Sequence, residues 1–196
     1  MKPTSKSKSV LALVLAITLT TTACSTQWIT TALQDLPVLT QMALNLASLV
    51  SVLASGQQAS AAETAVIQNI SVQASRNLNL LEGLCADYKA SRDAATLQKI
   101  QTVISDLNRN LPALLQSAHI ANPVLSTRVA AAVNLILSTV NSLAALMPQN
   151  APVTSQRAPQ SQVASANDLK RQWNQQVCAP TGNPALDAAF AQSIIR

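Results

Sequence analysis

The chain has 196 residues, of which 48% are hydrophobic and only 2% aromatic, with a formal net charge of +5. Three of the 13 basic residues are Lys2, Lys6 and Lys8, and without them ten basic residues stand against eight acidic ones, which leaves +2. A charge this small, in a chain with few aromatic rings for base stacking, argues against a nucleic-acid-binding protein.

Residues 1–23 have the pattern of an export signal. The three lysines lie in residues 1–9 with no acidic residue, and residues 10–19, VLALVLAITL, form a short apolar core. A basic start, a short apolar core and a small-residue exit are typical of a signal peptide. The core is shorter than the roughly 20 apolar residues that a membrane-spanning helix needs. We therefore expect residues 1–23 to be removed on export.

The signal ends in the residues TTAC, from Thr21 to Cys24. This stretch resembles the lipobox of bacterial lipoproteins, in which small residues precede a cysteine that is acylated and becomes the first residue. The resemblance implies a lipid on Cys24 and a protein held at the membrane facing the periplasm. With Ser25 after the cysteine, it implies the outer membrane if the host is diderm. Thr21 stands where the family prefers leucine, so cleavage near Ala23 and secretion without a lipid stays an alternative.

Residues 24–147 carry four segments in which apolar residues recur at helical spacing. Asn45, Asn134 and Asn141 fall off these stripes, as the polar face of an amphipathic helix requires. We predict an all-α fold, an antiparallel bundle of about four long helices followed by one or two short ones. The stripes are Ala32, Leu36, Leu39, Ala43, Leu46, Val50 and Leu53; Ile67, Ile70, Ala74, Leu78, Leu81, Cys85 and Tyr88; Leu97, Ile100, Ile104, Leu107, Leu111, Leu114 and Ala118; and Leu125, Val129, Val133, Ile136, Val140, Leu143 and Met147.

Helix-breaking residues predict where the bundle turns. Gly56 is expected to end the first helix, and residues 121–123, ANP, to separate the third from the fourth. Around residues 91–93 there is no strong breaker, so the second and third segments join by a tight turn or run on as one helix. Pro37 and Pro112 fall inside the stripes and are expected to kink or restart their helices.

The end of the chain differs in composition and pattern from the four apolar segments before it. Residues 148–164 are rich in Pro, Gln and Ser and predict a linker. Residues 165–196 predict a short helical segment packed on the bundle. Its first helix is expected to start near Ser165 or Asn167 with residues 168–177 as its body, and residues 185–195 predict a last short helix.

Two long stretches, residues 36–62 and 129–156, contain no charged residue. Each carries many Asn, Gln, Ser and Thr residues on one side of the helix, whereas a helix in lipid is apolar all round. This favours a water-soluble bundle. Helices that insert into a membrane stay as the alternative.

Cysteines and tryptophans each allow two interpretations. If Cys24 is acylated, Cys85 and Cys178 remain, an even number that suits a disulfide in an oxidising compartment. Alternatively, Cys85 is a small apolar core residue. Trp28 either rests at a membrane interface or closes the end of the bundle. Trp173 either pins its short helix to the bundle or is an exposed anchor for a partner.

No residue set predicts catalysis, a cofactor, a metal site or a recognisable small-molecule substrate. His119 has no ligand partner at metal-binding spacing, and we expect it at the surface or at a helix end. Acidic residues are spread along the helices, where we expect them to be solvated: Asp35, Glu63, Glu82, Asp87, Asp93 and Asp106. The expected protein is a non-enzymatic, lipid-anchored bundle of the cell envelope that binds or scaffolds an unknown protein partner. The alternative is a membrane-active helical protein.

Overall fold

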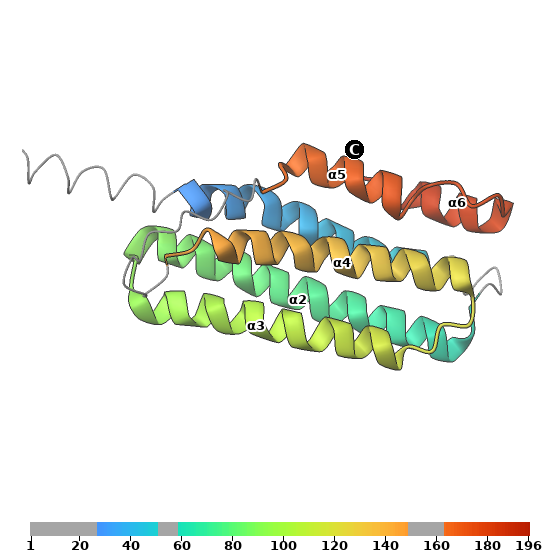
Figure 1. Cartoon of the computed structure of the whole chain (residues 1–196), viewed down its shortest axis with the longest axis horizontal. Coiled ribbons are helices and arrows are strands. Elements are labelled where there is room, and N and C mark those ends of the chain that lie inside the picture. Colours follow the sequence, from blue (N-terminus) through green and yellow to red (C-terminus); the bar gives the residue numbers. More distant parts are fainter. Residues whose placement is uncertain (1–26, 51–58, 149–162) are drawn as a thin grey trace, which may run out of the picture.

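The structure is a computed structural model that describes residues 27–50, 59–148 and 163–196. These residues form helices, turns and loops without a strand, which confirms the predicted all-α fold. The first helix covers residues 27–50 up to the edge of the described range. The others are α2 (Ala61–Ser91), α3 (Ala94–Ser117), α4 (Pro123–Ala145), α5 (Ala166–Gln176) and α6 (Pro184–Gln192). Figure 1 shows the long helices side by side, with the shorter α5 and α6 along the outside.

Contacts between distant residues show that neighbouring long helices run antiparallel. The rings of Trp28 and Tyr88 lie 5.8 Å apart, at the start of the first helix and the end of α2. Further along the same pair, the Ser71 hydroxyl donates to the Ala43 carbonyl at 2.6 Å. Asn108 of α3 and Asn141 of α4 exchange side-chain hydrogen bonds of 2.7 and 3.0 Å. The predicted antiparallel bundle is therefore confirmed.

The turn between α2 and α3 consists of only Arg92 and Asp93. Arg92 adopts the left-handed conformation with φ 52°, and its N–H donates to the Tyr88 carbonyl, which ends α2. Asp93 caps α3, accepting a hydrogen bond from the Thr96 N–H at 2.7 Å. Of the two alternatives left open by the sequence, the tight turn is the correct one. Because Arg92 takes the left-handed conformation and Asp93 caps the next helix, the turn needs neither glycine nor proline.

The turn between α3 and α4 lies where the ANP residues predict it. The Asn122 side chain accepts from the N–H groups of Val124 and Leu125, and Pro123 occupies the first turn of α4, where its missing N–H costs nothing. Just before the cap residue Asn122, the Ala121 N–H donates a hydrogen bond to the Glu63 carboxylate of α2 at 2.6 Å. This bond fastens the beginning of α2 to the α3–α4 turn.

Both internal prolines are helical, so of the two effects expected of them, a kink or a restart of the helix, the restart is wrong. α3 continues from Ala94 to Ser117 through Pro112, and residues 27–50 are helical through Pro37. Packing of each helix on the bundle outweighs the lost backbone hydrogen bond, because both prolines stand inside strongly apolar stripes. The expected cap at Gly56 and most of the predicted linker, residues 149–162, lie outside the described residues.

Apart from Leu53, which lies outside the described range, the four predicted stripes form the core. Their members are buried, except that Tyr88 and Leu114 are half-buried against the same cluster. The core is wider than the stripes, because the first helix also buries Trp28, Ile29, Met42 and Leu49. Asn134 and Asn141 are exposed and Asn45 is half-buried, consistent with their predicted place off the stripes.

The C-terminal segment belongs to the same core. Leu169 and Trp173 of α5 and Leu186, Ala189 and Phe190 of α6 are part of the one buried cluster. α5 packs on α4, where the Arg128 guanidinium donates to the carbonyls of Gln176 and, at 3.2 Å, Ala179.

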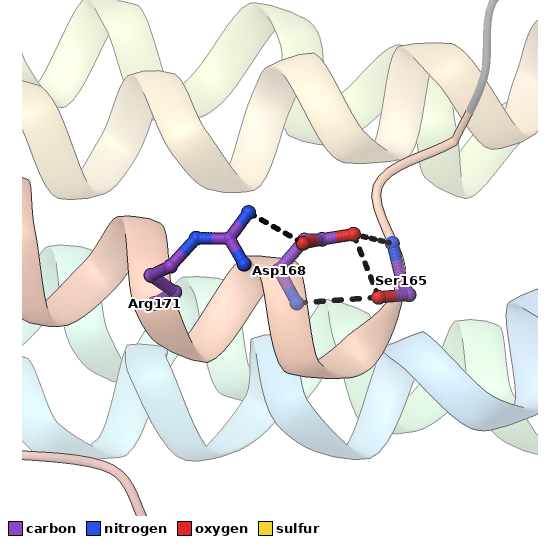
Figure 2. Close-up of polar contacts among 3 residues, drawn as sticks. All are labelled: Ser165, Asp168 and Arg171. Atoms are coloured by element: carbon purple, nitrogen blue, oxygen red, sulfur yellow. Dashed lines mark hydrogen bonds and ion pairs between the residues drawn. The ribbon is translucent and has the colours of Figure 1, made fainter.

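Helix α5 begins at a complete cap. The Ser165 hydroxyl accepts from the Asp168 N–H at 3.2 Å and donates to the Asp168 carboxylate at 2.8 Å, which in turn contacts Arg171 at 2.6 Å (Figure 2). Reciprocal bonds of this kind satisfy the N–H groups that a helix start leaves unpaired. Of the two predicted starting residues, Ser165 rather than Asn167 is the cap.

Candidate functional site

The predicted lipidation residue, Cys24, lies outside the described residues, so lipidation stays a prediction. The structure begins only three positions later, at Gln27. The remaining predicted residues are Trp28, Trp173, Cys85, Cys178 and His119. Each lies in the described part of the chain.

Trp28 does not lie at the surface. Its side chain is 2% exposed, and its ring packs at an interplanar angle of 37° on Tyr88 of α2. Its indole N–H has no hydrogen-bond partner. An interface anchor would need an accessible ring with its N–H directed to water or headgroups. The interface interpretation is therefore wrong for the folded bundle, and Trp28 closes its end.

Trp173 is completely buried and fastens the C-terminal segment together. Its indole N–H donates to the Ser193 carbonyl at 2.9 Å, and the Asn45 side chain of the first helix donates to the same oxygen at 2.9 Å. One carbonyl thus joins α5, the residues after α6 and the first helix. The interpretation of Trp173 as a residue that pins its helix to the bundle is correct, and the interpretation as an exposed anchor is wrong, because no part of the ring is accessible.

Cys85 and Cys178 are free, buried thiols, so the structure does not contain the disulfide that their even number allows. Burial, helped by the negative charge of Glu82, raises the pKa of Cys85 to about 12. Burial also raises the pKa of Cys178 to about 11, although the Trp173 indole and the Arg128 charge act in the opposite direction. Neither thiol has the lowered pKa of a reactive cysteine.

We expect both thiols to resist alkylation at neutral pH while the protein is folded, because thiolate is the reactive form, both side chains are buried and burial raises both pKa values. Intact mass measured after maleimide treatment should show neither residue modified. In guanidinium chloride, where the protein is unfolded, maleimide should modify both thiols within the same reaction time. A mass increase of two protons on reduction, seen without any alkylation, would instead show that the two cysteines are bridged.

Asp35 is buried, contrary to the expectation from the sequence. Its side chain is 1% exposed in the first helix, and its Oδ2 oxygen has no hydrogen-bond partner. Burial raises its pKa to about 6. The expectation of a solvated carboxylate is wrong here, as it is for the buried Glu63, although for Asp35 a signal was present. Asp35 stands three residues after Ala32 and four before Leu39, so the three share one helix face.

Buried polar atoms without partners gather on and beside the first helix. Within the described residues they are the indole nitrogen of Trp28, Oδ2 of Asp35 and the hydroxyls of Thr40 and Ser193. Three belong to the first helix, and Ser193 accepts a hydrogen bond from Asn45 of that helix through its carbonyl. Since an unpaired buried polar group costs about 1–3 kcal/mol, the first helix is the least well satisfied of the long helices.

A cleft of about 660 Å³ opens between α5, α6 and the turn that joins them. Its wall includes Cys178, Pro180, Ala191 and Ile194, the last with 47% of its surface exposed. Asp187, the acidic residue on the wall, accepts hydrogen bonds from the N–H groups of Thr181 and Gly182 and from the Thr181 hydroxyl. These bonds lower the pKa of Asp187 and direct its carboxylate to the turn rather than to a substrate. The cleft offers apolar contact, without a nucleophile and base in hydrogen-bond reach of each other.

His119 is exposed next to the end of α3, at φ 24°, as expected for a surface or helix-end histidine. In the described residues no group of three or more His, Cys, Asp and Glu side chains is placed to hold a metal ion. Among the helices described, α4 is long and apolar enough to cross a membrane, with a mean hydropathy of 1.4, but half of that window is buried inside the bundle.

Comparison with family models, curated proteins and solved structures finds no match to this chain.

Proposed function

We propose that this protein is an exported, lipid-anchored helical bundle of the bacterial cell envelope with a binding or scaffold role rather than a catalytic one. The observation that carries the proposal is the TTAC stretch after a signal-like segment, placed immediately before a bundle. A lipid on Cys24 would join the membrane to the first helix with only Ser25 and Thr26 between them.

The burial of the apolar residues supports a protein that acts in its folded state. The stripes of the four long helices face one another, and the two tryptophans are buried in the same core. A protein that keeps its apolar faces in its own core presents polar helix faces and shallow clefts to partners. This is the surface expected of a binding or scaffold protein.

Intact mass spectrometry of the membrane fraction tests the anchor. We expect a mass that begins at Cys24 and includes a diacylglycerol. In a Cys24→Ser variant this mass should be absent and the protein should leave the membrane fraction. A mature chain with an unmodified Cys24, found in the soluble fraction, would show that the protein is secreted without a lipid.

The second candidate is a membrane-active protein, favoured by one observation: the length and apolar composition of α4. In this proposal the bundle opens and α4 enters the bilayer. Dye release from vesicles by the Cys24→Ser protein separates the two candidates. Release would support the second candidate, while intact vesicles and full susceptibility to protease would support the first.

A further inference from the structure

The antiparallel bundle has two dissimilar ends. One end contains the start of the first helix, the α2–α3 turn and the end of α4, and we call it the proximal end (Figure 1). The Trp28–Tyr88 contact ties the first two of these together. The opposite, distal end contains the α3–α4 turn and Arg128 near the start of α4, beside the α5–α6 connection.

The chain between Cys24 and the proximal end is very short. Two residues separate Cys24 from Gln27, which is already helical. Even fully extended, three steps along the backbone span about 10 Å. A lipid on Cys24 would therefore hold the proximal end against the bilayer surface, whereas the distal end lies a further 36 Å or so away along the roughly 1.5 Å rise per residue of the first helix.

The α2–α3 turn suits a headgroup surface. Ser91, Arg92 and Asp93 are exposed, and Lys89 is exposed one turn before them. Between residues 87 and 99 three basic residues (Lys89, Arg92, Lys99) stand against two acidic ones (Asp87, Asp93). The Asp93 carboxylate is occupied by the Thr96 N–H and the Ser91 hydroxyl, both at 2.7 Å. Lys89 and Arg92 are in no ion pair within the described residues.

From this geometry we infer that the bundle stands on its proximal end, with the α2–α3 turn in contact with anionic lipid headgroups through Lys89 and Arg92. The inference rests on the proposed anchor at Cys24. A basic residue near an anionic membrane contributes about 1 kcal/mol, which is enough to orient a bundle that the lipid already holds in place.

This orientation has a consequence for the rest of the surface. Arg128, near the start of α4, donates a hydrogen bond to the carbonyl of Ala179, a residue of the α5–α6 cleft. Along α4, the cleft beside Arg128 would lie about 25 Å and the α3–α4 turn about 35 Å beyond the proximal end, so both would face away from the membrane. They are then accessible to a partner in the periplasm.

Hydrogen exchange on vesicles tests the orientation independently of acylation in the cell. The chain beginning at Cys24 retains every member of the core cluster, from Trp28 to Ile195. Its Cys24 thiol is coupled at neutral pH to a maleimide lipid in vesicles of phosphatidylglycerol and phosphatidylcholine. Cys85 and Cys178 do not compete, because both are buried and burial raises their pKa.

We expect amide exchange at residues 91–94 to slow several-fold on the vesicles relative to the uncoupled chain, while residues 118–122 exchange as in solution. Equal slowing at both turns, slowing only at residues 118–122, slowing along one side of a helix, or no change at either turn would each overturn the inference. The exchange pattern of the uncoupled chain checks that the fold is intact.

Two charge reversals on exposed arginines supply a matched comparison. Arg92→Glu should abolish most of the slowing at residues 91–94 on anionic vesicles, and Arg109→Glu, on α3 beyond its midpoint, should preserve it. If both variants behave like the parent chain, contact through Arg92 is refuted. If mass spectrometry finds no lipid on Cys24 in the cell but the exchange result holds, the proposed anchor is wrong, while the proposed membrane-facing surface is still supported.

Discussion

Replacing Asp35 with asparagine is expected to stabilise the protein at pH 7 by about 1–3 kcal/mol, the scale of the pKa shift that burial imposes on this carboxyl. Asparagine has nearly the shape of aspartate but carries no charge. The Asp35 carboxyl is 1% exposed, and its Oδ2 oxygen lacks a partner. At neutral pH the folded wild-type protein holds a buried charge that the variant does not. Urea unfolding of the two proteins, compared at one temperature, measures the difference.

The same pair of proteins predicts a pH dependence. Burial raises the pKa of Asp35 from 3.8 to about 6 in the folded state. Between these values the folded protein binds a proton that the unfolded chain has released, so the Asp35 contribution to stability falls as pH rises and is fully lost above pH 6. The stability difference between Asp35→Asn and wild type should therefore shrink towards zero as pH falls from 7 to 4.

Comparing the two proteins at each pH removes the effect of other groups. Hydrogen bonds from Ser91 and Thr96 lower the pKa of Asp93 to about 2, and a hydrogen bond from Ser60 lowers the pKa of Glu63. The stability that these two carboxylates contribute is lost as the pH falls, and it is lost equally in the variant and in the wild-type protein. A difference between variant and wild type that stays constant from pH 4 to 7 would show that the Asp35 pKa is not raised. An Asp35→Asn protein less stable than wild type at pH 7 would show that the carboxylate has a partner.

Truncating Trp173 to alanine should cost about 3–5 kcal/mol, as expected for removing a fully buried indole. The ring is completely buried, and its N–H joins α5 to the Ser193 carbonyl. Because Asn45 of the first helix shares that carbonyl, the loss should loosen α5, α6 and the first helix together. Chemical unfolding measures the change in the free energy of unfolding. Relative to wild type, hydrogen exchange in the variant should accelerate more in residues 166–196 than in α2 and α3.

Two substitutions on α5 serve as controls for Trp173→Ala. Trp173→Phe keeps most of the apolar volume and loses only the hydrogen bond, so it should lie well between wild type and alanine. Arg171→Ala removes an exposed ion pair with Asp168 and should change stability little. Equal losses for Trp173→Ala and Arg171→Ala would contradict the assigned role of the indole.

Much of the fold could be predicted because periodicity is a local property. Every described member of the four stripes is buried or half-buried, and the starts near Ser165 and Asn122 follow from capping chemistry that a few neighbouring residues determine. The expected restarts at Pro37 and Pro112 failed for the opposite reason. Local preference disfavours proline there, and packing across the bundle overrides it.

The spacing of Asp35 from Ala32 and Leu39 places it on their helix face, but how far it is buried depends on more than its own helix. One stripe predicts contact with one neighbouring face, but the first helix meets α2 through Ser71 and the C-terminal residues through Ser193. Contact on two sides widens the buried arc until it includes Asp35 and Thr40. The same enclosure resolved the alternatives for Trp28 and Trp173, since a single sequence does not say which apolar residue is covered by a distant one.

The sequence by itself determined the helical class, the positions of the long helices, the start of α5 to within two residues and the export-signal pattern, because all of these depend on residues within a few turns of one another. Only the tertiary structure decided the burial of both tryptophans and Asp35 and the state of Cys85 and Cys178 as free, buried thiols. These depend on which helices pack together. That choice is made by summed contacts between segments far apart in the chain, and no local pattern contains it.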